Sequence, residues 1–238
     1  MRALIHSFND MVQQIRNQSR ERRDLLADVT HELRTPLTIM QGEIEGMLDG
    51  IYPREDDQLH ELLRETQRMS GLIEDLRIMA LADRGALPIQ VEPTDLSQLT
   101  SETMAGYRAR AEQAGISLSL ETGEDLPAVM IDPLRFRQVV GNLINNALHH
   151  TEAGDQIIIR IHTKGADAIR VEVFDSGSGI DPVDLPHIFE RFYKGKDSEG
   201  SGLGLAIAKQ LIETQSGQIH AASEIGQWTS ITIELPLA

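Results

Sequence analysis

DPLRFRQVVGNLINNALH, residues 132–149, predicts a helix that begins immediately after Asp132. Asp132 is a preferred N-cap residue, and Pro133 suits the first helical position because the N–H that it lacks would have no partner there. Around this helix, helical stretches (94–113 and 205–214) alternate with β-rich ones (116–120, 157–161, 169–174 and 230–235). Antiparallel hairpins with interspersed helices are typical of an α+β sandwich. We expect helices on one face of a mixed sheet.

Toward the N-terminus, residues 1 to about 84 show apolar residues at helical spacing. Breaks at Asp49-Gly50 and near Asp83-Arg84-Gly85 end two successive stripes. The stripe positions are Leu4, Phe8, Met11, Ile15, Leu26, Val29, Leu33, Leu37, Met40, Ile44 and Met47, then Leu59, Leu62, Thr66, Met69, Ile73, Leu76 and Ala80. Two such helices predict an all-α hairpin, and a second copy would cover its apolar side in a four-helix bundle. We expect a homodimer; alternatively, the C-terminal half covers this side.

The composition excludes several classes of function. The 238 residues include 22 Lys and Arg against 37 Asp and Glu, a net charge of −15. Such a chain lacks the clustered cations that nucleic acid requires. It has no cysteine, so disulfides, thiolate nucleophiles and cysteine metal sites are excluded. No apolar run reaches the roughly 18 residues of a membrane span, and no secretory signal is found at the N-terminus. We expect a cytoplasmic location.

A histidine stands out in the first stripe. His31 is two residues from both Val29 and Leu33, so it is turned about 200° from each at about 100° per residue. Its imidazole should therefore face solvent, where a free ring nitrogen is a nucleophile near neutral pH. Glu32 could orient the imidazole or accept its proton, and Pro36 should bend the helix. The alternative is an ordinary surface histidine.

Four further stretches could form a nucleotide pocket. Asn142 and Asn146 lie four residues apart on one helix face, where two amide oxygens can ligate a hard cation with phosphate. Asp175 ends a β-rich stretch and is followed by Gly177 and Gly179, which permit close approach of a flat ligand. Each stretch also has a purely structural interpretation, as amides bonded within the fold or as a glycine turn.

A glycine-rich turn, GSGLGL at 200–205, precedes a helix whose free N–H groups could bind phosphate. Neither the Walker spacing nor a dinucleotide fingerprint is present. The preceding segment, 185–199, is mostly polar around a few aromatic residues and is flanked by glycines. This pattern suits a mobile lid that carries cations over a phosphate tail, or else an ordinary surface loop.

Five motifs in order resemble the transmitter core of bacterial sensor histidine kinases: HELRTP (31–36), NLINNA (142–147), DSGSGI (175–180), FERF (189–192) and GSGLGL (200–205). The resemblance covers nearly the whole chain. It implies a dimerisation and phosphotransfer hairpin at 20–84, a linker at 85–93, and an ATP-binding domain of the Bergerat type at 94–238. Residues 1–19 resemble the last helix of a HAMP signal relay, which implies a membrane connection only through an upstream segment of a longer receptor.

The resemblance also implies an activity. ATP would phosphorylate His31 with Glu32 as general base, and the phosphoryl group would pass to an aspartate of a response regulator. Thr35 would orient water for phosphatase activity on that regulator, and Asn142 and Asn146 would hold Mg²⁺. The other implied nucleotide-binding residues are His149, Asp175 as adenine reader, Gly177, Gly179, Phe189, Arg191, Tyr193, Lys194, Gly200, Gly202, Leu203 and Gly204.

Two departures from the family pattern concern the pocket. His149-His150 stand where the family often has Lys-Tyr. Histidine is the weaker cation near neutral pH, so we expect a phosphate contact there to be lost, weakened or pH-dependent. Trp228 stands at the second glycine of a Gly-x-Gly-Thr motif, and we expect its indole to narrow or reshape that edge of the pocket. Two rival functions are an ATPase without histidine phosphorylation and a purely structural coiled-coil protein.

Overall fold

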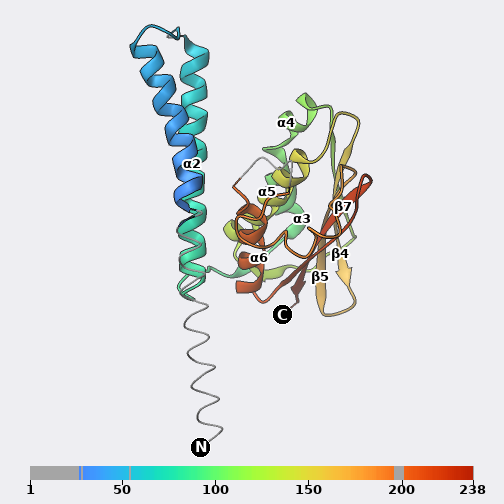
Figure 1. Cartoon of the computed structure of the whole chain (residues 1–238). Coiled ribbons are helices and arrows are strands. Elements are labelled where there is room, and N and C mark those ends of the chain that lie inside the picture. Colours follow the sequence, from blue (N-terminus) through green and yellow to red (C-terminus); the bar gives the residue numbers. More distant parts are fainter. Residues whose placement is uncertain (1–26, 28, 54, 196–200, 238) are drawn as a thin grey trace, which may run out of the picture. The chain divides into compact units, whose positions relative to one another are not determined.

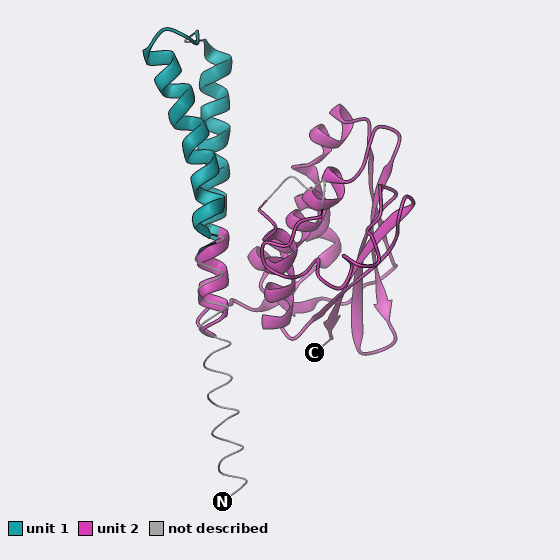
Figure 2. Cartoon of the chain, in the orientation of Figure 1, with its two compact units in different colours: residues 1–74 teal, residues 75–238 magenta. Residues whose placement is uncertain are grey.

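The computed structural model describes residues 27, 29–53, 55–195 and 201–237. The chain divides into two compact units, residues 1–74 and 75–238 (Figure 2). The relay helix expected at 1–19 lies outside the described residues. Among the helices that are described, none combines the length and the apolar character needed to cross a membrane.

The described part of the first unit belongs to a helical hairpin, as the sequence predicts, and the end of its second helix continues past residue 74 into the second unit (Figure 1 and Figure 2). Its first helix is described at 27 and 29–48 and continues through Pro36, which is buried. The chain turns at Asp49-Gly50, where Gly50 adopts a φ of +74° that favours glycine. Helix α2, Asp56–Ala82, then begins with two aspartates that suit the positive end of its dipole.

Much of the apolar surface of the hairpin is exposed. Leu37 and Ile44 belong to the first stripe, and Leu59 and Ile73 belong to the second, yet all four side chains are about half exposed. Other large apolar side chains exposed on this unit are Ile39, Leu48, Ile51, Tyr52 and Leu63. Monomeric proteins seldom leave so many large apolar groups together in water, so the hairpin alone is an incomplete core.

The second unit contains a five-stranded sheet in the order β2-β4-β5-β7-β6. The pair β2–β4 is parallel and the other pairs are antiparallel, which confirms the expected mixed sheet. The strands are β2 (Ser117–Thr122), β4 (Gln156–Lys164), β5 (Ala168–Asp175), β6 (Gln218–Glu224) and β7 (Trp228–Pro236). A separate two-stranded sheet pairs β1 (Glu92–Thr94) with β3 (Val129–Ile131).

Three helices cover one face of the five-stranded sheet (Figure 1). They are α3 (Leu96–Ala105), α5 (Pro133–His149) and α6 (Gly204–Thr214). Helix α5 has the bounds that the sequence predicts, and Asp132 caps it by accepting a hydrogen bond from the Arg135 N–H at 3.1 Å. Its buried residues, which include Phe136, Val140 and Ile144, pack with buried strand residues to form the core.

The helix expected over 94–113 is wrong in two respects. Thr94 ends β1, and the remainder divides into α3 and the short α4 (Arg108–Gln113) at Gly106 and Tyr107. Tyr107 turns toward α5 there, and its hydroxyl lies 2.7 Å from the position that a Cβ on Gly141 would take. Strands β3 and β6 were not expected, because β3 has three residues and β6 has one large apolar residue, Ile219.

Candidate functional site

His31 lies on the first helix of the hairpin, and its side chain is 80% exposed, as its place on the helix predicts. Its Nδ1 is 4.0 Å from a carboxylate oxygen of Glu32, slightly beyond hydrogen-bond distance. With Nδ1 toward Glu32, the other ring nitrogen is left for an incoming electrophile. The Thr35 hydroxyl donates to the His31 carbonyl oxygen at 3.3 Å and thus lies one turn along the same helix.

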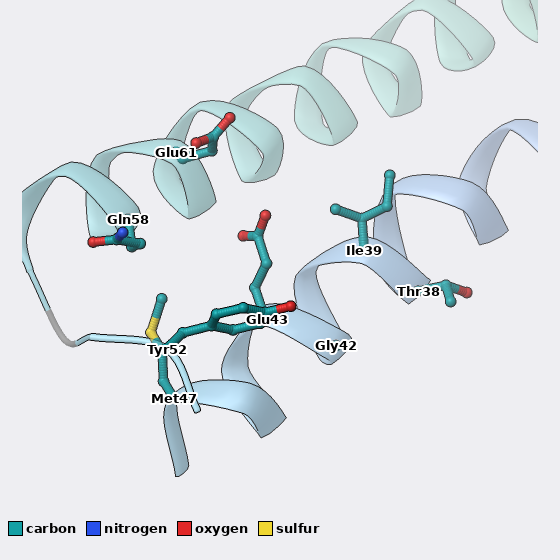
Figure 3. Close-up of a pocket in the computed structure, with 8 residues that line it drawn as sticks. All are labelled: Thr38, Ile39, Gly42, Glu43, Met47, Tyr52, Gln58 and Glu61. Carbon is teal, nitrogen blue, oxygen red and sulfur yellow. The ribbon is translucent and has the colours of Figure 1, made fainter. Parts of the chain in front are cut away.

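The hairpin also contains a cavity of about 440 Å³ near its turn (Figure 3). Ile39, Met47 and Tyr52 supply apolar walls, and Glu43 faces α2, which carries Gln58 and Glu61. The Tyr52 ring packs on Gly46, where a Cβ would approach it to 2.3 Å. This cavity lies among the exposed apolar side chains of the hairpin and contains none of the residues expected to bind nucleotide.

Two helices of the second unit are joined by an asparagine. The Asn142 Nδ2 on α5 donates to the Gly204 carbonyl oxygen, at the start of α6, at 3.0 Å. Because this bond uses the amide nitrogen, the Asn142 oxygen remains available as a ligand. Asn146, one turn later, is half-buried like Asn142. Asn145 instead accepts from Arg110 at 2.9 Å and is thereby a structural amide.

Asp175 ends β5 and is only 3% exposed. Burial raises the pKa of this carboxyl from 3.8 to about 6, and the nearby charge of Asp155 adds to the increase. The Gly177 N–H opposes it by donating to Oδ1 at 3.1 Å. A buried carboxylate with one backbone donor retains the capacity to accept from a ligand amine.

The two glycines after Asp175 allow close contact between backbone segments. A Cβ on Gly177 would lie 2.0 Å from the His150 carbonyl oxygen, and one on Gly179 would lie 2.1 Å from the Glu224 carbonyl oxygen. Gly179 also has a φ of +66°. Both positions therefore require glycine for packing within the fold, whether or not a ligand binds.

The expectation for Trp228 is wrong. In the register of β5 with β7, Asp175 pairs with Thr229, and strand neighbours point to opposite faces, so Trp228 lies on the other face. Its indole stacks on Phe174 at a centroid distance of 6.2 Å, so it does not narrow the pocket edge beside Asp175.

Thr229 is a candidate site residue, beside Asp175, that the sequence did not single out. It is buried on the inner face opposite Asp175, and its hydroxyl is 3.1 Å from that of Ser223. The signal was present in the sequence, because Thr229 lies two, four and six residues before Ile231, Ile233 and Leu235, and residues two apart in a strand point to the same face.

The N-terminus of α6 has no side-chain cap. Leu203, at the N-cap, is fully buried and carries no oxygen in its side chain, so the first N–H groups of the helix keep their capacity to bind an anion. Gly202 precedes it with a φ of +67°, and a Cβ there would lie 2.7 Å from the Phe192 backbone. Gly200 lies outside the described residues.

The segment before α6 places its aromatic and charged residues in local contacts. Arg191 forms a two-bond ion pair with Asp83, one of its bonds measuring 2.8 Å. Tyr193 donates to Asp184 at 2.6 Å, which raises the pKa of its phenol to about 12. Phe189 has the Lys209 ammonium 5.8 Å from its ring centre, while Lys194 is exposed. These contacts give no direct support to the expected phosphate-binding roles of Arg191 and Tyr193.

The two histidines at the end of α5, His149 and His150, differ in their exposure to solvent. His149 is exposed, whereas His150 is half-buried, and burial together with the charge of His149 lowers the pKa of His150. The carbonyl oxygen of His150 accepts from the Ser178 N–H at 3.0 Å. His150 therefore supports the Asp175 turn through its backbone, and its neutral ring adds no cation for phosphate.

Comparisons with known proteins match both units. Residues 21–85 match the His Kinase A (phospho-acceptor) domain, and residues 131–238 match the histidine kinase-, DNA gyrase B- and HSP90-like ATPase family. The signal transduction histidine-protein kinase BaeS of Escherichia coli K12 is 34% identical over 98% of this chain. The chain spans 51% of the length of BaeS.

Solved structures agree with these matches. The histidine kinase AdeS of Acinetobacter baumannii superposes with a TM-score of 0.76 at 29% identity, over 87% of this chain and 98% of the other. Full-length ShkA in complex with AMPPNP gives a TM-score of 0.66 at 27% identity, over 90% of this chain and 46% of the other. With a phosphoacceptor domain followed by an ATPase domain, this chain belongs to the sensor histidine kinases of two-component systems and contains their transmitter core.

Proposed function

We propose that this chain transfers the γ-phosphoryl group of ATP to His31 and then to an aspartate of a response regulator. One observation carries the proposal. The first unit has the exposed imidazole of His31 beside the Glu32 carboxylate, and the second unit has the buried carboxyl of Asp175 and the N-terminus of α6, which has no side-chain cap. The expected cytoplasmic location stays a prediction.

The residues of the second unit fit ATP. Asp175 would accept from the exocyclic amine of adenine, and the backbone at Gly177 and Gly179 would lie along the ring. The N–H groups at the start of α6 would receive phosphate oxygens, because they face no side-chain cap. The complex of the relative ShkA with AMPPNP supports a nucleotide at this site.

The two asparagines fit Mg²⁺. The oxygen of Asn142 is left over by the bond to Gly204, and Asn146 lies one turn along α5. Amide oxygens are hard ligands that suit Mg²⁺ together with substrate phosphates. When bound, the ion would neutralise charge on the phosphates. Asn142 would also hold the start of α6 beside those phosphates.

The transfer needs one bond made and one broken. Nε2 of His31 attacks the γ-phosphorus, the bond to the β,γ-bridging oxygen breaks, and ADP leaves. The imidazole then carries a positive charge, and its Nδ1 proton passes to Glu32. The separation of 4.0 Å must shorten by about 1 Å for that proton to move, which a side-chain rotation can supply.

The exposed apolar side of the hairpin supports a homodimer. Leu37, Ile44, Leu59 and Ile73 would be covered by the same residues of a second copy, because a two-fold interface repeats one surface. The cavity near the hairpin turn is lined by two other exposed apolar side chains, Ile39 and Tyr52, and would contribute to the same interface. A homodimer is therefore part of the proposal.

The decisive test is incubation of the chain with γ-labelled ATP and Mg²⁺. We expect an acid-labile, base-stable label that disappears in His31→Gln and persists in the control His60→Gln, a second exposed histidine of the hairpin. Label that persists in His31→Gln would refute the assignment. ATP hydrolysis without a label would instead support an ATPase, and absence of nucleotide binding would support a structural coiled-coil protein.

We also propose phosphatase activity on the regulator, supported by Thr35 one turn from His31. A Thr35→Ala variant should slow loss of phosphate from a phosphorylated receiver domain about tenfold while its autophosphorylation is retained. Thr38→Ala, an exposed threonine three residues further along the same helix, is the matched control. Equal dephosphorylation by the Thr35 variant and the parent protein would remove Thr35 from this reaction.

A further inference from the structure

Asp132 occupies the junction between the linker and the helix that carries the two asparagines. It follows β3 and caps α5, and it is only 5% exposed. After α2 the chain passes through 86–91 and then forms β1, in which Glu92 pairs with Ile131, the residue before Asp132. The side chain of Asp132 is thus close to the last residues of the linker.

The two oxygens of Asp132 bind different segments. Oδ1 accepts from the Arg135 N–H at 3.1 Å, which is the capping bond of α5. Oδ2 accepts from the Gln90 N–H, in the linker, at 2.8 Å. A helix cap requires only one acceptor, so serine or asparagine would serve for capping alone. The bond from Oδ2 to the Gln90 N–H is therefore not needed to cap the helix.

The backbone of Asp132 extends the connection to α6. Its N–H donates to Oε1 of the buried Gln215 at 2.7 Å, and Nε2 of Gln215 donates to the Leu211 carbonyl oxygen at 2.9 Å. Gln215 lies at the C-terminal end of α6, whereas Asn142 binds Gly204 at its N-terminal end. Helices α5 and α6 are therefore antiparallel, and both ends of α6 are hydrogen-bonded to Asp132 and Asn142, which favours movement of the two helices as one body.

We propose that Asp132 is a positioning residue that connects the linker to this helix pair, so that the linker sets where the γ-phosphate is presented to His31. Asn142 lies ten residues beyond Asp132, about 15 Å along a rigid helix. A small displacement at Gln90 is therefore passed to the phosphate end of α5 and α6. The inference rests on the proposed autophosphorylation, whose rate depends strongly on the alignment of the reacting atoms.

The sharpest variant changes the linker donor. Gln90→Pro removes the backbone N–H and leaves Asp132 and its cap in place, whereas the control Gln90→Ala keeps the N–H. From the other side, Asp132→Asn keeps one capping oxygen and loses an acceptor. Its control is Asp95→Asn at the cap of α3, where both bonds, from Ser97 and Gln98, go to the same oxygen.

We expect Gln90→Pro and Asp132→Asn to lower the kcat of His31 phosphorylation about fivefold to tenfold, with KM for ATP within about twofold of the parent value. Both controls should keep the parent kcat. Transfer from phosphorylated His31 to a receiver domain should be unchanged, because nucleotide presentation is finished by then. A merely structural role would instead raise KM, lower the melting temperature and reduce kcat together.

Hydrogen exchange supplies a readout that needs no phosphoryl transfer. The Gln90 amide should exchange at least about tenfold faster in Asp132→Asn than in the parent protein, with the amides of α5 still protected. If the parent labels His31 and both variants keep its kcat, the inference is overturned while the proposed function stands. If the parent fails to label His31, the proposed function is overturned, and the inference with it.

Discussion

Trp228 stacks on Phe174 with ring centroids 6.2 Å apart and planes inclined by 24°, on the face of the sheet opposite the one that carries Asp175. This placement predicts that Trp228→Phe leaves ADP affinity within about twofold of the parent value, since another aromatic ring can stack there. Thr229→Val, one residue away on the inner face, should weaken ADP binding about tenfold by removing a buried hydroxyl. Calorimetric titration measures both. A large loss in Trp228→Phe alone would contradict this assignment of faces.

The raised pKa of Asp175 predicts that its ionised carboxyl lowers the stability of the fold, although the proposed binding of adenine uses that carboxyl. The folded-state pKa of about 6 exceeds the usual 3.8, so the folded protein binds a proton that the unfolded chain releases, and acidification between these values stabilises the fold through this group. At pH 7 the buried charge is unfavourable by up to about 3 kcal/mol.

Asp175→Asn should therefore raise the free energy of unfolding of the second unit at pH 7 while abolishing ADP binding. The gain over the parent protein should shrink as the pH falls from about 6 to 4, because the parent carboxyl is then protonated. Denaturant titrations of both proteins at pH 7 and pH 4.5 measure the difference. A variant that is less stable than the parent at pH 7 would contradict the burial argument.

Gly177→Ala should be severe. The added Cβ would lie 2.0 Å from the His150 carbonyl oxygen, and a backbone atom cannot rotate away as a side chain can. We expect a loss of about 2 kcal/mol or more in unfolding free energy, and loss of ADP binding as the Asp175 turn shifts. Gly106→Ala is the control, since its Cβ would meet an atom at 3.5 Å and its φ is −70°. Equal effects of the two substitutions would show that crowding is not the cause.

The Asp83–Arg191 ion pair provides a test of Arg191 as a phosphate ligand. Asp83→Asn removes the carboxylate that holds the guanidinium, so ATP affinity should rise about threefold, the scale of one exposed charge contact. Asp83→Glu keeps the charge and should behave like the parent protein. Unchanged affinity in Asp83→Asn would remove Arg191 from the phosphate-binding residues. Titration at two salt concentrations would show the screening expected of such a contact.

Patterns that depend on neighbours along the chain predicted the fold well. Helix α5 was found with its bounds because a cap, a following proline and apolar periodicity agree over 133–149. The exposure of His31 followed from its angle to Val29 and Leu33 in the same way. The break in the helix expected over 94–113 was missed, because Tyr107 turns toward Gly141, a residue of another helix. Sequence periodicity carries no record of such a contact.

The candidate site was predictable in its residue types but not in its partners. Asp175 and its glycines could be picked out by composition, whereas the pairing of Asp175 with Thr229 depends on strand register. The same register places Trp228 on the outer face, which its position in a glycine motif did not indicate. Asp132 was recognised as a cap, yet its bond to Gln90 joins residues 42 positions apart.

The exposed leucines and isoleucines of the hairpin do not by themselves determine which hairpin would pair with it. Burial of apolar side chains removes them from water but hardly distinguishes one apolar partner from another, so this stripe would pair with many helices of similar pattern. Glu43 and Glu61, which line the cavity among these side chains, carry charge that a foreign hairpin would have to match. In a cell that contains several such proteins, the few polar groups beside the stripe would therefore determine which hairpins pair. Reversing one of these charges could change the partner.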